Sequence, residues 1–89
     1  MVRRVVAADN VLFHQFGEEA VLLNITSETF FRLSGSAVDM WQTLVASASV
    51  DQAKDQLLAQ YNVDPDVLST DLNTFIDSLH KAKLIEIRE

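Results

Sequence analysis

Apolar residues alternate with polar ones through the first third of the chain, as they do in half-buried β-strands. The first apolar run covers residues 11–16 and ends at Gly17, which tolerates the positive φ of a tight turn. A second run covers 21–25 and a third 29–33. The polar connections are too short for a crossover, so the sequence predicts three antiparallel strands in a meander.

The third apolar run has two faces. Thr29, Phe31 and Leu33 point one way, and we expect Phe31 and Leu33 to be core residues beneath the helices. Phe30 and Arg32 point the other way. Two roles stay open for Phe30, which either covers the far side of the sheet or lines a binding site. Arg32 lies on a strand edge, where a solvated charge prevents pairing with other chains and so aggregation; alternatively, it pairs with an acidic residue of a bound peptide.

After residue 34 the apolar spacing becomes helical in three successive segments. Hydroxyls in 34–36 offer an N-cap for the first helix, and Ser49 with Gln52 has the form of a capping box for the second. Pro65 favours the start of the third. Residues 84–88 would close the domain as a short extended segment. The pattern predicts one α+β domain over residues 1–89, with its core at about 11–87 and three strands preceding three helices.

A three-stranded meander is an open sheet. Its first and third strands each leave a row of N–H and C=O groups that water, a loop or another chain must satisfy. Such an edge beside a helix is the geometry for β-augmentation, in which an extended peptide adds a strand and places alternate side chains in pockets. The open edges therefore favour a peptide-binding function.

Composition narrows the classes of function. The chain has 89 residues, 48% of them hydrophobic, no cysteine and a net charge of −6. So small a core cannot also enclose a deep catalytic cavity, and the lack of cysteine excludes thiol chemistry and fits a reducing cytoplasm. The acidic balance disfavours nucleic acid. The apolar stretches are too short for a membrane span or a signal peptide.

Candidate catalytic groups are few. His14 and His80 lack acidic neighbours at metal-ligand spacing, apart from Asp77 beside His80. No serine lies in a nucleophile elbow, and the carboxylate pairs lie in a turn and at a helix start, where they suit the helix dipole. The sequence therefore predicts a protein that is not an enzyme, with no cofactor and no metal.

A winged-helix DNA-binding regulator is the main alternative class. Its reading helix would be the third one, but residues 64–79 contain no Lys or Arg and carry four aspartates, at 64, 66, 71 and 77. Phosphates would repel that helix from the major groove. Arg3 and Arg4 form a lone basic pair, which we expect at a mobile N-terminus. A structural adaptor that dimerises through its sheet edge is a further alternative.

Several segments together carry a family resemblance. They are the run 20–24, the sequence Glu-Thr-Phe-Phe-Arg-Leu-Ser at 28–34 followed by Trp41, the sequence Gln-Tyr-Asn-Val-Asp-Pro at 60–65, and Leu-His-Lys-Ala-Lys-Leu-Ile at 79–85. In their order and spacing, residues 11–87 resemble the PqqD-like family. Ser34 stands where that family usually has Asn, and Lys83 where it usually has Gly.

The resemblance implies a RiPP recognition element, a winged helix-turn-helix-like domain that binds the leader segment of a ribosomally made precursor peptide. Family members take the leader as an additional antiparallel strand on the third strand, beside the third helix. The overall pattern favours the leader-binding protein of lasso peptide biosynthesis, which presents the leader to a separate cysteine-protease-like peptidase. The alternative is the peptide chaperone of pyrroloquinoline quinone biosynthesis.

The expected peptide site combines both lines of reasoning. The backbone of 29–33 would pair with the leader, side chains of the third strand and third helix would form apolar pockets, and charged residues would add polar contacts. The acidic third helix suits a leader that carries Lys or Arg. The site residues that we expect are Glu28, Thr29, Phe30, Phe31, Arg32, Leu33, Leu68, Asp71, Leu72 and Phe75.

Overall fold

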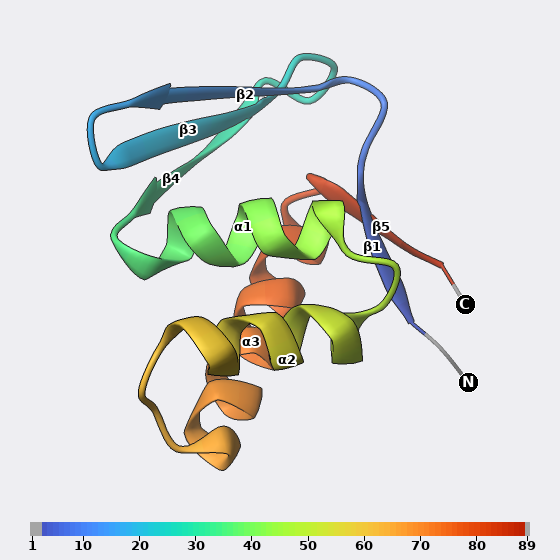
Figure 1. The fold of residues 1–89 in the computed structure, drawn as a ribbon. Coiled ribbons are helices and arrows are strands. Elements are labelled where there is room, and N and C mark those ends of the chain that lie inside the picture. Colours follow the sequence, from blue (N-terminus) through green and yellow to red (C-terminus); the bar gives the residue numbers. More distant parts are fainter. Residues whose placement is uncertain (1–2, 89) are drawn as a thin grey trace.

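The computed structural model describes residues 3–88 (Figure 1). Within that range four strands precede three helices, and a fifth strand follows them. The elements are β1 (Arg4–Ala7), β2 (Val11–Phe16), β3 (Glu19–Asn24), β4 (Thr29–Ser34), α1 (Ser36–Ala46), α2 (Val50–Gln60), α3 (Pro65–Lys81) and β5 (Ile85–Arg88).

The predicted meander is the sheet β2-β3-β4, with both neighbouring pairs antiparallel. Its two connections are short turns, at 17–18 and 25–28, where the sequence has polar residues and glycine between the apolar runs. Three helices follow the sheet. The predicted α+β class, with a three-stranded antiparallel sheet followed by three helices, is therefore confirmed.

A second, two-stranded sheet joins the two ends of the described chain. β1 pairs antiparallel with β5, and Val5 lies opposite Ile87 (Figure 1). The extended segment expected at 84–88 is confirmed as β5. The expectation of a mobile N-terminus was wrong, because Arg4 begins β1 and the backbone N–H of Val50 donates to the carbonyl of Arg3 at 2.7 Å. Val5 is 1% exposed, so β1 contributes to the core.

The helix starts follow the expected signals in two of three cases. Ser49 caps α2 by accepting from the Gln52 backbone N–H at 3.0 Å, and Asp64 caps α3 immediately before Pro65. The serine cap expected for α1 was wrong. Gly35 occupies that position with φ 58°, a conformation that glycine adopts readily, and no side chain caps the helix.

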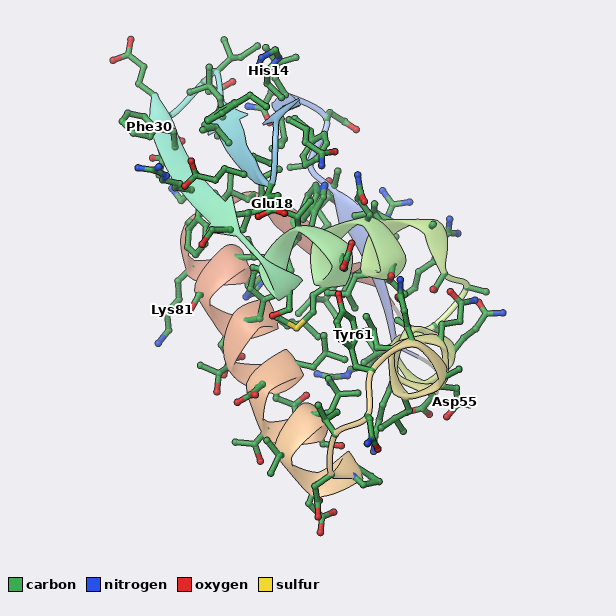
Figure 2. All side chains as sticks on the ribbon, turned by 60° about the vertical axis from the view of Figure 1, so that its left-hand side comes forward. His14, Glu18, Phe30, Asp55, Tyr61 and Lys81 are labelled. Carbon is green, nitrogen blue, oxygen red and sulfur yellow. The ribbon has the colours of Figure 1, made fainter. Side chains whose placement is uncertain are left out.

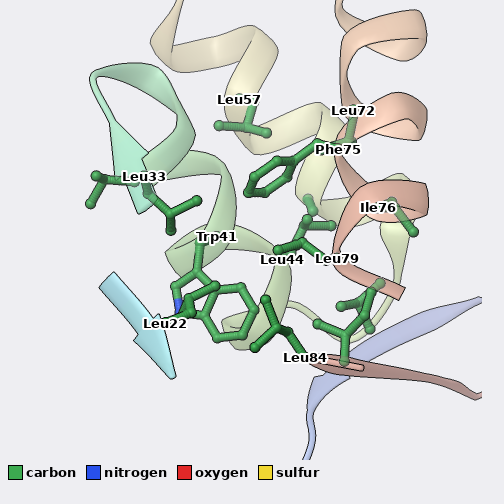
Figure 3. Close-up of a cluster of buried hydrophobic side chains, with 14 of the residues drawn as sticks. Leu22, Leu33, Trp41, Leu44, Leu57, Leu72, Phe75, Ile76, Leu79 and Leu84 are labelled. Carbon is green, nitrogen blue, oxygen red and sulfur yellow. The ribbon is translucent and has the colours of Figure 1, made fainter. Parts of the chain in front are cut away.

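The core lies between the inner face of the sheet and the helices. In Figure 1, α1 runs beneath the sheet, with α2 and α3 on its other side. Every layer contributes large side chains that are less than 5% exposed (Figure 3). They include Leu22, Leu33, Trp41, Leu44, Leu57, Leu72, Ile76, Leu79 and Leu84. This packing fixes the position of β4 relative to the helices.

The end of α3 is a Schellman motif. Lys83 has φ 61°, its N–H donates to the carbonyl of His80, and the Leu84 N–H donates to the carbonyl of Leu79. A left-handed conformation costs a residue with a Cβ about 1–2 kcal/mol, and glycine pays little of that cost. The lysine at this position therefore carries backbone strain.

We expect Lys83→Gly to be more stable than Lys83→Ala by about 1 kcal/mol, since only glycine relieves the strain and both variants lose the same charge. Urea unfolding followed by circular dichroism measures the difference. Equal midpoints and slopes for the two variants would contradict this account of Lys83.

Candidate functional site

The outer edge of β4 is open. In the sheet order β2-β3-β4, the part of the chain that the structure describes pairs β4 with β3 alone. The strand is six residues long, and the register joins each of its residues to one of β3, from Asn24 opposite Thr29 to Glu19 opposite Ser34. An antiparallel ladder uses alternate residues on each side, so half of the β4 backbone groups point away from β3.

The hydrogen bonds at the strand ends identify that half. The Gly35 N–H donates to the carbonyl of Glu18 at 3.4 Å, which makes these two residues a hydrogen-bonded pair at the end of the ladder. Counting back by twos, Leu33, Phe31 and Thr29 exchange hydrogen bonds with β3. The N–H and C=O groups directed to the open edge are therefore those of Phe30, Arg32 and Ser34.

The β4 side chains lie on the two faces that the alternation predicts. Leu33 is 1% exposed and Phe31 packs half-buried against the core. Phe30 is 71% exposed and projects from the sheet away from the helices (Figure 2), opposite Leu23. Arg32 is also exposed and makes an ion pair with Glu19, Nη2 to Oε1 at 2.5 Å.

The residues expected from α3 divide into two groups. Leu68, Leu72 and Phe75 belong to the core, with exposures of 7%, 1% and 8%, whereas Asp71 is exposed. The Leu72 side chain, like that of Leu33, is enclosed in the core and does not reach the surface. Glu28, in the turn before β4, is exposed and has φ 57°.

A pocket of about 210 Å³ lies among the three helices. It begins two residues beyond the end of β4, at Ser36, and its walls come from the start of α1, the end of α2 and the first turns of α3. The lining is mostly apolar: Ser36, Met40, Leu57, Tyr61, Val63, Val67, Leu68 and Asp71. Of the residues expected in the peptide site, Leu68 and Asp71 are thus brought together here.

Sequence reasoning missed the pocket as a unit, although two of its residues left a signal. Val67 falls at helical spacing with the buried residues of α3, but it is 55% exposed, and Val63 beside the Asp64 cap is 43% exposed. Two exposed valines flanking a helix start are not needed by the core. They form the outer rim of the pocket.

Tyr61 fixes one wall of the pocket. Its hydroxyl donates to the Asp39 carboxylate, which joins the end of α2 to α1 (Figure 2 labels Tyr61). The hydrogen bond to Asp39 raises the pKa of the Tyr61 phenol, because the carboxylate accepts from the protonated hydroxyl and so stabilises it. The tyrosine ring is therefore held in a fixed position beside Met40 and Leu57.

The solvent face of α3 is acidic. Asp64, Asp66, Asp71 and Asp77 are all exposed, and no Lys or Arg interrupts residues 64–79. Over residues 3–88 no cluster of three or more His, Asp or Glu side chains is arranged to hold a metal ion. No helix within the described chain has the length and apolar character needed to cross a membrane.

The fold places the protein in a class, α+β and winged helix-turn-helix-like, in which an open sheet edge borders the helices. A family model described as "Coenzyme PQQ synthesis protein D (PqqD)" matches residues 19–85. The chain therefore belongs to the PqqD family, and the resemblance seen in the sequence is confirmed.

A solved structure, described as "TbiB1 in Complex with the TbiA(beta) Leader Peptide", has the same fold. The TM-score is 0.84 at 27% sequence identity, and the similarity covers 91% of this chain and 94% of that one. No curated protein matches the chain.

Proposed function

We propose that the protein binds the leader segment of a ribosomally synthesised precursor peptide as an extra antiparallel strand on β4. The observation that carries the proposal is the open β4 edge, with the backbone groups of Phe30, Arg32 and Ser34 directed outward. The likeness to TbiB1, whose structure holds a leader peptide, supports it. Main-chain hydrogen bonds would supply affinity, and side-chain contacts the specificity.

Strand polarity relates the pocket to the leader. A strand antiparallel to β4 has its N-terminal end beside Ser34, and Ser36 is already part of the pocket wall. Leader residues upstream of the paired segment therefore reach the pocket, where an apolar side chain can contact Val67 and Leu68. A Lys or Arg close by can pair with Asp71. So small an interface, below about 1,200 Å², depends on a few anchors of this kind.

The expected site residues then have different roles. Backbone pairing comes from 29–33 through the outward groups, apolar contact comes from Phe30 and the partly buried Phe31, and Arg32 and Asp71 offer charges to the peptide. Glu28 lies at the end where the paired leader segment leaves the sheet. The remaining four, Leu33, Leu68, Leu72 and Phe75, form the apolar floor.

The pathway that we propose is lasso peptide biosynthesis in the cytoplasm. The protein is non-catalytic and without a cofactor, and it presents the leader to a separate cysteine-protease-like peptidase, which removes it. The pyrroloquinoline quinone pathway is the second candidate, because the matching family model carries that description. A DNA-binding role is disfavoured by the four exposed aspartates of α3.

Calorimetry with synthetic peptides tests the proposal. We expect saturable binding of the leader encoded beside this gene and no binding of a scrambled leader with the same composition. Binding of a pyrroloquinoline quinone precursor in place of a lasso leader would select the second pathway. Binding of neither, by a protein shown to be folded, would overturn leader recognition.

A further inference from the structure

The face of the three-stranded sheet that points away from the helices carries several exposed apolar side chains; we call it the outer sheet face. The register defines it, because residues directly opposite one another share a face. One row across the sheet is Leu12, Leu23 and Phe30. Phe16 and Val21 lie on the same face, together with the polar residues His14, Glu19, Arg32 and Ser34. Leu12, Phe16 and Phe30 are 54%, 46% and 71% exposed.

Exposed apolar side chains concentrate on this sheet. The described chain has seven large hydrophobic residues exposed, and two of them, Val63 and Val67, form the rim of the pocket. The other five lie in β2, in β4 or just after β3: Leu12, Phe13, Phe16, Ile25 and Phe30. Of these, Phe13 lies on the helix-facing side, opposite the buried Leu22 and stacked on Trp41, so it is not part of the outer sheet face. Isolated exposed apolar residues are ordinary, but a contiguous apolar patch on a small protein marks an interaction surface.

Most of this surface is separate from the proposed leader edge. Leu12 lies in β2, two strands away from the free edge of β4. Phe30 lies at the junction of the two surfaces. A strand added to β4 would continue the sheet, and every second side chain of that strand would lie on the outer sheet face. A protein seated there would contact Leu12, Leu23 and the bound leader at once.

Charge indicates what kind of protein fits. Glu18 and Glu28, in the turns at opposite ends of the sheet, are exposed, and Arg32, within the face, is already paired with Glu19 (Figure 2 labels Glu18 and Phe30). The middle row of the face is His14, Val21 and Arg32, so its apolar part is the row Leu12, Leu23 and Phe30 at the end of the sheet beside the turn that holds Glu28. An apolar row next to a carboxylate fits an apolar patch bordered by Lys or Arg. A second copy of this chain fits less well, because two domains of net charge −6 repel each other.

We propose that the outer sheet face docks the enzyme that acts on the leader-bound precursor, through an apolar patch of that enzyme edged with basic residues. The inference rests on the proposed function, since it needs a bound leader to be handed on. The domain would thus present two surfaces of one sheet, the β4 edge to the leader and the outer sheet face to the enzyme. Docking on that face positions the enzyme next to the outward side chains of the leader.

Leu12→Glu tests the docking surface. The Leu12 side chain is exposed and outside the expected leader contacts, so we expect the variant to fold and to bind leader within twofold of the wild type. Cleavage of the precursor by the purified peptidase encoded beside this gene is the second readout. We expect the domain concentration that half-maximally stimulates cleavage to rise at least tenfold. Gln56→Glu, an exposed change of the same charge on α2, should leave both unchanged.

The outcomes separate the two proposals. A wild-type domain that binds no leader overturns the proposed function and this inference with it. Leader binding and cleavage that are both unaffected by Leu12→Glu overturn the docking surface alone. A wild-type dimer that becomes monomeric in Leu12→Glu, measured by light scattering, would assign the face to a second copy and would also overturn enzyme docking.

Discussion

Arg32→Pro is expected to weaken leader binding by about 10- to 100-fold, because it removes an outward N–H from the middle of the open edge and leaves a leader carbonyl without its donor. The N–H of residue 32 makes no bond to β3, so the internal ladder survives the change. Edge strands tolerate proline where the lost N–H faced solvent. Calorimetry with the synthetic leader measures the loss, and circular dichroism establishes that the variant is folded.

The matched control is Arg32→Ala. It removes the same side chain and the same exposed ion pair with Glu19, which contributes little to stability, but it keeps the N–H. The difference between Arg32→Pro and Arg32→Ala therefore reports the backbone contact. Equal affinities for the two folded variants would show that the leader does not pair with β4. Proline at position 31 is a poorer probe, because the Phe31 N–H faces β3 and its loss would disrupt the sheet itself.

The sequence was most informative where structure is local. Alternation placed Phe31 and Leu33 on the core side of β4 and Phe30 on the other, and Pro65 marked the first turn of α3. Each of these features depends on neighbours only a few residues away. The open edge of β4 also followed from strand order alone, since a meander cannot close.

Features that join distant segments were missed. β1 is only four residues long and pairs with β5 at the other end of the chain, so no local pattern distinguishes it from a loose terminus. The pocket draws its walls from α1, α2 and α3, and nothing in any one helix indicates that they converge. Which β4 residues bond to β3 and which face the open edge also follows only from the structure, through the hydrogen bond between Gly35 and Glu18.

Asn24 is the clearest case of a residue whose role is hidden in the sequence. Its neighbours, Ile-Thr-Ser, indicate a polar turn, and the Ser27 N–H does donate to its side-chain oxygen at 3.0 Å. Yet Asn24 is only 4% exposed. Its Nδ2 donates at 2.7 Å to the carbonyl of Lys83, 59 residues away, and its oxygen accepts from Asn10 Nδ2 at 3.1 Å. The carboxamide thus joins the end of β3 to the end of α3.

We expect Asn24→Ala to lower the free energy of unfolding by about 2–4 kcal/mol, because it removes the buried carboxamide and leaves the Lys83 carbonyl and the Ser27 N–H without their partners in a partly buried place. For a domain of this size the midpoint of thermal unfolding should fall by about 10–25 °C. Asn10→Ala, which removes only one of the three contacts, is the control, and we expect it to cost about 1 kcal/mol or less. Urea unfolding of both variants measures the two losses in the free energy of unfolding. If they were equally stable, the bond from Asn24 to Lys83 would contribute nothing, and core packing alone would hold the sheet against α3.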